Sequence, residues 1–280
     1  MIIKIKFLFI KRFIIIFVIF CILFNFTNVR NSLNVSTSPS VRLPIIMYHE
    51  VNTKGLGTYV ISPREFEEDI IYLKKEGYTT IDIEDLVAFE YNNINLPEKP
   101  IMLTFDDGYF SMYTYILPIL EKYDCKAVIS IVGEYVDQST EKQYPNGYLN
   151  WSQVKELEAS PNVEIQNHTY SMHELSKRKG CKIIKGESFD DYKTELLDDI
   201  GYLQLLIEEN TGNKPKAFTY PFGITCKECD EILEEIGFIA TLSCYSGVNV
   251  LKGDKEELYE LKRFNRPSGI NRVKFFKQFE

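Results

Sequence analysis

Two adjacent carboxylates follow an apolar run in the middle of the chain, Ile101-Met-Leu-Thr-Phe-Asp106-Asp107-Gly108. The apolar and β-branched residues predict a buried strand, and α/β proteins build their sites where such strands end. Two neighbouring Asp side chains can be buried at low cost only beside a positive charge. A metal ion would supply that charge, binding one carboxylate and leaving the other free as a base. An ordinary Asp-Asp-Gly turn at a helix start is the alternative.

The second candidate group is a pair of histidines. His168 and His173 are two of the three histidines in the chain, and they lie five residues apart. On a helix their side chains would point about 140° apart, and on a strand they would face opposite sides. The segment must therefore curl if both rings bind one ion. Residues 163–166 predict a short strand just before it, so the curl would again follow a strand end. A chance pair of surface histidines is the alternative.

Four segments together resemble the polysaccharide deacetylase family of the NodB-homology type. Thr104-Phe105-Asp106-Asp107-Gly108 matches the first motif of that family, and the segment from His168 to His173 resembles its metal-binding histidine motif. Tyr220-Pro221-Phe222-Gly223 resembles the third motif in a subgroup that lacks the usual arginine. Pro44-Ile-Ile-Met-Tyr48-His49-Glu-Val resembles the opening strand of that subgroup, which includes deacetylases of poly-N-acetylglucosamine. The resemblance covers roughly residues 43 to 270.

The resemblance implies a metal-dependent hydrolase that removes N-acetyl groups from an extracellular amino-sugar polymer. That polymer would be peptidoglycan or an exopolysaccharide of the poly-N-acetylglucosamine type. Asp107, His168 and His173 would bind a divalent ion, zinc or a similar transition metal. Asp106 would then be the general base. The acetyl pocket would be lined by the third motif, that is by Tyr220, Pro221, Phe222 and Gly223, with a backbone N–H near Phe222 for the oxyanion.

The chain departs from the family pattern in its C-terminal third. The Asp-Trp fourth motif is not visible around residues 243–248, and Leu261-Lys-Arg263-Phe stands where a histidine is usual. We expect Arg263 to orient Asp106, a bidentate task suited to a guanidinium. A surface charge at a strand end is the alternative.

His49 is the remaining candidate for the general acid that protonates the departing amine. It directly follows the apolar run 43–48, so it would lie at the C-terminal end of a strand, on the face where the other motifs gather. A histidine that merely closes the barrel, with its ring satisfied by hydrogen bonds, is the alternative. Glu50 is a weaker candidate because it would point the other way if the strand continued.

Strand and helix patterns alternate along residues 43–242, which predicts parallel strands joined by right-handed crossovers. About seven units fit, and the family fold, a distorted (β/α) barrel, agrees with this α/β pattern. A helix around residues 113–123 should be kinked at Pro118. Residues 133–150 are predicted to be a long loop that forms a wall of the site.

The first 30 residues predict a membrane or signal helix. Residues 13–26 are apolar apart from Asn25, and four basic residues precede them. We favour an uncleaved signal anchor that leaves the body extracellular, with a cleaved signal peptide and secretion as the alternative. Residues 31–42 would form a tether, and residues 43–280 a single deacetylase domain whose core starts at about residue 99.

Charge and cysteine usage exclude several classes of function. The formal net charge is −8, and residues 1–31 hold five of the 32 basic residues but no acidic one. The remainder therefore carries 27 basic and 40 acidic residues, which argues against nucleic acid and fits a neutral glycan as partner. A catalytically idle carbohydrate-binding protein would not need the carboxylates and histidines of both motifs. A thiol oxidoreductase built on Cys226 and Cys229 lacks a thioredoxin-like context.

Overall fold

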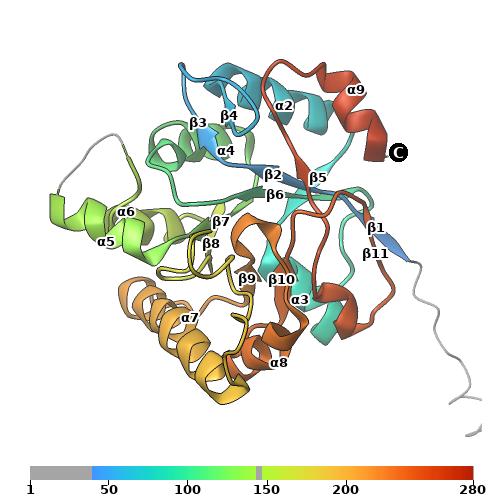
Figure 1. Ribbon diagram of the computed structural model, residues 1–280. Coiled ribbons are helices and arrows are strands. Elements are labelled where there is room, and N and C mark those ends of the chain that lie inside the picture. Colours follow the sequence, from blue (N-terminus) through green and yellow to red (C-terminus); the bar gives the residue numbers. More distant parts are fainter. Residues whose placement is uncertain (1–39, 143–146, 280) are drawn as a thin grey trace, which may run out of the picture. The chain divides into compact units, whose positions relative to one another are not determined.

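The computed structural model describes residues 40–142 and 147–279 (Figure 1). The predicted signal helix at residues 1–30 and most of the predicted tether lie outside these residues. Between residues 40 and 142, and from 147 to 279, no helix is both long and apolar enough to cross a membrane.

One parallel sheet forms the centre of the domain. Seven strands follow one another in the order β10-β9-β8-β7-β6-β2-β12, and β5 pairs with the first residues of β6. Every pairing within this sheet is parallel, which confirms the predicted α/β class with about seven parallel strands. The strands are β2 (Ile45–Tyr48), β5 (Thr79–Ile81), β6 (Pro100–Phe105), β7 (Ala127–Ile131), β8 (Val163–Asn167), β9 (Ala217–Thr219), β10 (Ala240–Leu242) and β12 (Phe264–Asn265).

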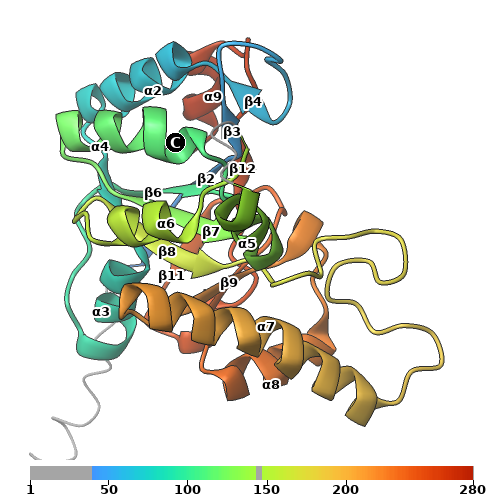
Figure 2. The same ribbon diagram turned by 90° about the vertical axis from the view of Figure 1, so that its left-hand side faces the viewer.

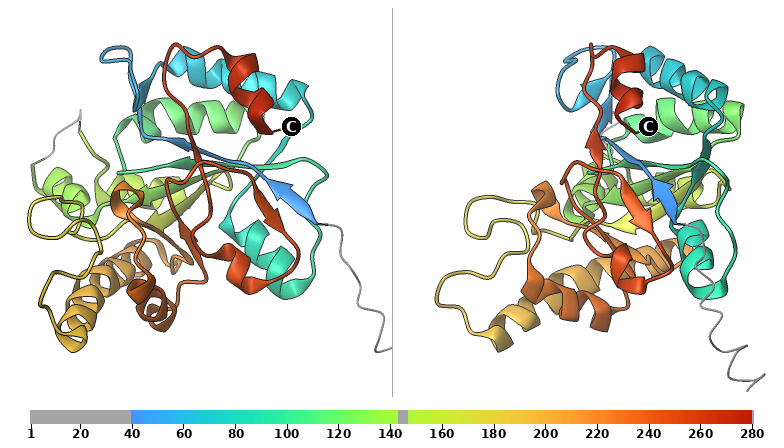
Figure 3. Two further views of the ribbon diagram at one scale, coloured as in Figure 1. Left: turned by 45° about the vertical axis from the view of Figure 1, so that its right-hand side comes forward. Right: turned by 90° about the vertical axis from the view of Figure 1, so that its right-hand side faces the viewer.

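The segment that leads into β12 links the two edges of the sheet. The Leu261 N–H donates to the carbonyl of Thr241 over 2.8 Å, and Ser243 donates back to the Leu261 carbonyl over 2.9 Å. Three residues later, Phe264 pairs with Ile46 of β2. Figure 3 shows this red segment beside the blue strand β2. The sheet therefore curls into a distorted barrel, as expected.

Helices cover the outside of the curled sheet. In Figures 1 and 2, α2, α4 and α9 lie on one side of β2 and β6, and α7 and α8 lie on the other side of the sheet. The helices are α2 (Pro63–Lys75), α3 (Ile83–Asn92), α4 (Leu117–Tyr123), α5 (Gly133–Lys142), α6 (Trp151–Glu158), α7 (Phe189–Thr211), α8 (Lys227–Ile236) and α9 (Arg272–Phe276). Two small sheets complete the fold, the antiparallel pair β1 (Val41–Leu43) with β11 (Asn249–Leu251) and the parallel pair β3 (Glu50–Val51) with β4 (Val60–Ile61).

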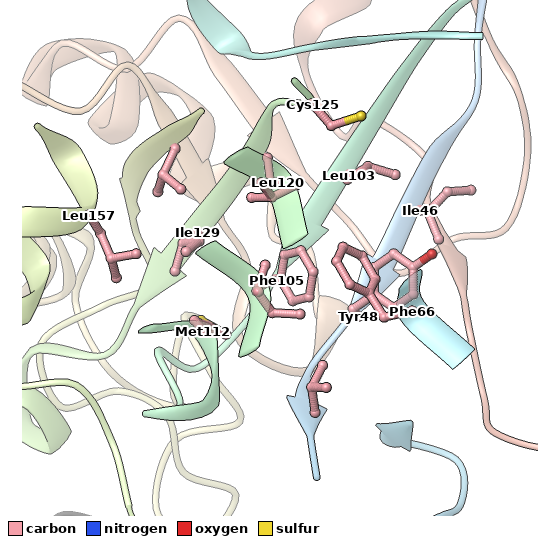
Figure 4. Close-up of a cluster of buried hydrophobic side chains, with 14 of the residues drawn as sticks. Ile46, Tyr48, Phe66, Leu103, Phe105, Met112, Leu120, Cys125, Ile129 and Leu157 are labelled. Atoms are coloured by element: carbon pink, nitrogen blue, oxygen red, sulfur yellow. The ribbon is translucent and has the colours of Figure 1, made fainter. Parts of the chain in front are cut away.

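Strand β6 is buried on both faces, which explains its continuous apolar sequence. Leu103 and Phe105 belong to the cluster under α2 and α4 (Figure 4), whereas Met102 belongs to a second cluster with residues of β2 and β7. The Phe105 ring stacks on Tyr48, with ring centroids 5.1 Å apart, and Phe66 of α2 meets both rings edge-on. This packing fixes the end of β6, where the two carboxylates follow.

The predicted loop over residues 133–150 is wrong, because its first ten residues form helix α5. Glycine is common in loops, but Gly133 begins a helix and is needed there because its neighbours leave no room for a side chain. A Cβ at this position would lie 2.5 Å from Cδ2 of Tyr170. The helix expected around residues 113–123 is present, with an irregularity just before Pro118. A π-helical turn at Met112–Ile116 runs directly into α4, so the missing N–H of Pro118 falls where the regular α-helical hydrogen bonding is already interrupted.

Candidate active site

Asp106 and Asp107 follow β6 directly, and the backbone turns sharply after them. The Asp106 N–H still donates to the carbonyl of Tyr48 over 3.1 Å, so this residue continues the strand pairing. Asp107 and Gly108 then both have positive φ angles, 73° and 74°. A Cβ on Gly108 would lie 3.1 Å from Cγ2 of Ile131. Glycine therefore suits this position for two reasons, the positive φ angle and the lack of room for a side chain. The turn places both carboxylates on the wall of one cavity.

The two histidines are brought together by a curl after β8, as the sequence required. His168 directly follows β8, and Thr169 has a positive φ of 72°. The Asn167 side-chain oxygen accepts from the Thr169 N–H over 2.9 Å. The buried Asp199 carboxylate of α7 accepts from the N–H groups of Tyr170 and Ser171, each over 2.8 Å. Side chains outside the curl therefore fix its backbone.

Asp107, His168 and His173 converge on one point, and their ligand atoms all lie within 4.8 Å of one another. Oδ1 of Asp107 is 3.5 Å from Nε2 of His168 and 3.3 Å from Nε2 of His173. Within the described part of the chain, this Oδ1 is buried without a hydrogen-bond partner, a costly state unless a cation binds it. One carboxylate and two imidazoles are a donor set that suits a zinc-type ion. The three residues therefore fit a divalent metal.

The orientation of His168 supports the same conclusion. Nδ1 of His168 donates to the carbonyl of Thr219 over 2.7 Å, which leaves the Nε2 lone pair facing Asp107. Burial would raise the pKa of Asp107, but the nearby rings of His168 and His173 hold it below its ordinary value. The carboxylate is therefore ionised and ready to bind a cation.

Arg263 is buried against Asp106 and is not a surface charge. Its two terminal nitrogens donate to the two Asp106 oxygens over 2.7 and 2.8 Å, in the bidentate arrangement that was expected. Its Nε donates to the carbonyl of Ser243 over 2.7 Å. Burial would raise the pKa of Asp106, but the Arg263 guanidinium lowers it to about 2. Asp106 is thus held as an oriented anion.

His49 lies on the wall of the same cavity as the two carboxylates. The cavity has a volume of about 410 Å³. Nδ1 of His49 is buried and has no hydrogen-bond partner among residues 40–142 and 147–279, so this nitrogen is not satisfied in the way that the alternative interpretation requires. Burial lowers the pKa of His49, while Asp106 and Asp107 act in the opposite direction. The residues that line the cavity are Met47, His49, Tyr59, Asp106, Asp107, Tyr109, His168, His173, Phe222, Cys244 and Asn265.

Of the third motif, only Phe222 lines the cavity. The residue is 40% exposed, and its ring lies 4.4 Å from the His173 ring, measured between centroids. Tyr220 is instead buried and donates its hydroxyl to Asp230 over 2.7 Å. A Cβ on Gly223 would lie 2.2 Å from the Cβ of Cys244, so this glycine permits close packing of the loop. Pro221 is buried away from the cavity wall.

Sequence reasoning missed several residues at the site. Tyr109 stands two residues after Asp107, and proximity to the first motif could have suggested it. Tyr59 comes from the connection before β4, and no local pattern indicates its position. Asp199 looks like one more acidic residue of α7, although its carboxylate holds the histidine curl. Cys226 and Cys229 lie away from the cavity, and the sulfur atoms of both contact the Tyr192 hydroxyl.

A profile of the polysaccharide deacetylase family matches residues 93–240, which include both carboxylates, both clustered histidines and the third motif. The chain belongs to the polysaccharide deacetylase family. His49 and Arg263 lie outside the part of the chain that the family profile matches.

Relatives of this chain come from several bacteria. It is 27% identical to a poly-beta-1,6-N-acetyl-D-glucosamine N-deacetylase of Escherichia coli K12, over 72% of this chain and 34% of the relative. It is 22% identical to the Staphylococcus aureus MRSA252 protein of the same name, over 68% of this chain and 63% of that one. The chain thus spans about a third of the length of the first relative and under two thirds of the second.

Solved structures show the same fold. A de-N-acetylase from Aggregatibacter actinomycetemcomitans superposes with a TM-score of 0.74 at 25% identity, covering 86% of this chain and 100% of that one. IcaB from Ammonifex degensii gives a TM-score of 0.70 at 23% identity, covering 85% and 95% of the two chains. The likeness to IcaB is one of fold.

Proposed function

We propose that this chain is a metal-dependent N-deacetylase, a hydrolase that removes acetyl groups from an extracellular polymer of N-acetylated amino sugars. The observation that carries the proposal is the convergence of Asp107, His168 and His173 beside an Asp106 that is held by Arg263. The names of the relatives favour poly-β-1,6-N-acetylglucosamine over peptidoglycan as the substrate. The basic and apolar N-terminus favours attachment to the cell membrane with the domain outside.

Amide hydrolysis needs an activated water, a polarised carbonyl and a proton for the departing amine. A divalent ion, most simply zinc, would be held by Asp107, His168 and His173 and would polarise the acetyl carbonyl when bound. Asp106 would accept the proton of the attacking water. Arg263 keeps this carboxylate ionised and fixes its direction, so that it does not need to reorganise during the reaction.

His49 would donate a proton to the departing nitrogen. Its ring lines the cavity together with Asp106, and its buried Nδ1 has no other partner in the part of the chain that the structure describes. Because burial lowers the pKa of His49, the protonated ring is a stronger acid than an ordinary imidazolium. The neighbouring carboxylates help it to acquire that proton. Phe222 would cover the acetyl group from the side of His173.

Acetate release from purified glycans tests the proposal. We expect release from poly-β-1,6-N-acetylglucosamine, its loss with a chelator and its return with added zinc. Peptidoglycan measured in parallel distinguishes the two candidate substrates. If the metal-loaded protein binds the glycan but releases no acetate, the alternative of an idle carbohydrate-binding protein is correct and the hydrolase proposal is wrong.

A further inference from the structure

Cys226 and Cys229 are two buried thiols, 4% and 0% exposed, that the proposed function does not use. They form a Cys-x-x-Cys segment at the start of α8, and Cys226 stands three residues after Gly223 of the third motif. We propose that this pair is a redox site, which forms an intramolecular disulfide bond by exchange with a small disulfide from the surroundings. Neither cysteine lines the cavity of the candidate active site, so the redox site is separate from the deacetylase function.

The start of α8 brings the two sulfur atoms together. Cys226 is the N-cap of the helix and Cys229 lies in its first turn, where the Cys229 N–H donates to the Cys226 carbonyl over 2.9 Å. Residues three apart in a helical turn are neighbours, and a disulfide needs Cα atoms about 4.4–6.8 Å apart. A hydrogen bond joins the two thiols. A bridge can therefore form without unwinding of the helix.

A buried tyrosine of α7 holds both thiols in place, since α7 and α8 lie side by side (Figure 2). The Tyr192 hydroxyl donates to the Cys181 carbonyl over 2.7 Å. Its oxygen lies 3.4 Å from the Cys226 sulfur and 2.8 Å from the Cys229 sulfur. The Cys229 thiol also donates to the Cys181 carbonyl, over 3.4 Å. Cys181 thus supplies backbone to this cluster, and the sulfurs that converge on one oxygen are those of Cys226 and Cys229.

The two thiols differ in how readily they lose their protons. The hydrogen bond with the Cys229 thiol lowers the pKa of Cys226 to about 6, while burial acts in the opposite direction. The same hydrogen bond, together with burial, raises the pKa of Cys229. A thiolate is the form that attacks a disulfide. Cys226 is therefore the attacking residue, and Cys229 is the one that closes the bridge.

The exchange balances with one molecule of a small disulfide such as oxidised glutathione. The Cys226 thiolate forms a bond to one sulfur of that molecule, whose S–S bond breaks and releases one glutathione thiolate. The Cys229 thiol then gives up its proton and attacks the Cys226 sulfur, which releases the second glutathione thiolate. Two protein thiols are oxidised, one external disulfide is reduced, and the released thiolates take up the two protons. A position outside the cell, as proposed above, would expose the domain to such disulfides.

The test reduces the purified full-length chain, removes the reductant, adds oxidised glutathione at pH 7 and maps every thiol and disulfide over time by mass spectrometry. In the folded wild type, the bridge between Cys226 and Cys229 should form at least about tenfold faster than a mixed disulfide at Cys244. Cys244 is the more exposed residue, but burial raises its pKa, so exposure and thiolate content predict opposite orders of reaction. Cys229→Ser should stop at a mixed disulfide between glutathione and Cys226.

Cys181→Ser is the matched control, because Cys181 is equally buried in the same cluster but meets Tyr192 and Cys229 through its carbonyl. It should keep the bridge. A bridge that includes Cys181, a faster reaction at Cys244, or free thiols at both Cys226 and Cys229 after prolonged exposure would overturn the redox site. Thermal unfolding checks that each variant folds, and the wild-type map alone decides if one does not. Acetate release enters none of these outcomes, so the redox site and the proposed function can fail independently.

Discussion

Asp106 and Arg263 form a charge pair that is almost completely removed from water, with exposed fractions of 3% and 0%. Such pairs rarely add stability compared with an apolar pair, because desolvation costs about as much as the attraction returns. Here the pair keeps a carboxylate ionised and oriented beside the candidate metal ligands. We therefore interpret Arg263 as a positioning residue that acts through Asp106.

The two carboxylates should respond differently to removal of their charge. Asp106→Asn should lower the rate of acetate release by at least about 10²–10⁴ and leave metal affinity intact, because a base is lost but a ligand is not. Metal affinity is measured by calorimetry with zinc, and thermal unfolding checks that the variant folds. Asp107→Asn is the comparison and should lose the metal. Equal loss of metal in both variants would show that the two roles are reversed.

His49→Ala tests the proposed acid. It should lower kcat by about 10²–10⁴ with little change in substrate affinity, because the ring would act on the leaving amine in the transition state. The rate is followed by acetate release, and substrate affinity by calorimetry on the metal-free protein. A rate within a few fold of wild type would exclude His49 as the acid.

At the scale of elements, the site depends on the short segments that come directly after β6 and β8. The end of β6 could be predicted from the apolar run that stops at two carboxylates, and the end of β8 from the strand pattern before the histidines. The spacing of the histidines implies that the backbone must curl, but the sequence does not indicate which residue holds the curl. That residue is Asp199 on α7, 26 residues beyond His173 in the sequence.

Asp199 should control metal affinity without touching the metal. Asp199→Ala removes the acceptor for the Tyr170 and Ser171 N–H groups, so the backbone that aims His173 would loosen. By analogy with other residues that support metal ligands, we expect zinc affinity to fall about 10–100-fold. Zinc calorimetry provides the measurement. Asp198→Ala, at the exposed neighbouring position on α7, is the control and should bind zinc like the wild type.

At the scale of the whole molecule, the site collects residues from His49 to Arg263, whereas the family profile ends at residue 240. The metal ligands could be predicted because they lie in compact motifs. The bidentate contact of Arg263 could be anticipated from the missing motif arginine. The contribution of Tyr59 could not, since the connection between β3 and β4 shows no strand or helix pattern at this residue. In the structure its carbonyl accepts from the Glu50 N–H over 3.0 Å, and its ring lies 4.7 Å from the His49 ring, measured between centroids. Helix α5 was missed because the need for Gly133 arises from contacts with Tyr170 and Leu203.

The stability of the domain should depend on pH through Glu164 of β8. Burial raises the pKa of this carboxyl from its ordinary value of 4.5 to about 8. The folded protein therefore keeps a proton that the unfolded chain releases, so the stabilisation is complete below about pH 4.5 and is lost as pH rises to about 8. Glu164→Gln should make the free energy of unfolding decline less steeply across this window. Urea unfolding at several pH values, in the presence of a chelator, measures the slope.

Glu209→Gln serves as the control for this prediction, because Glu209 is exposed on α7. It should keep the wild-type slope. If Glu164→Gln keeps the wild-type slope as well, ionisation of Glu164 is not a source of the pH dependence.

The segment from Leu261 to Asn265 joins both edges of the barrel and carries Arg263, and this has a consequence for biosynthesis. As an exported chain emerges on the outer side of the membrane, Asp106, Asp107 and the two clustered histidines come out well before Arg263. A nascent chain can thus gather its metal ligands while Asp106 still lacks its countercharge, and in that state the carboxylate must stay in water or take up a proton. Catalytic competence would then appear late, when the last strand docks between β10 and β2.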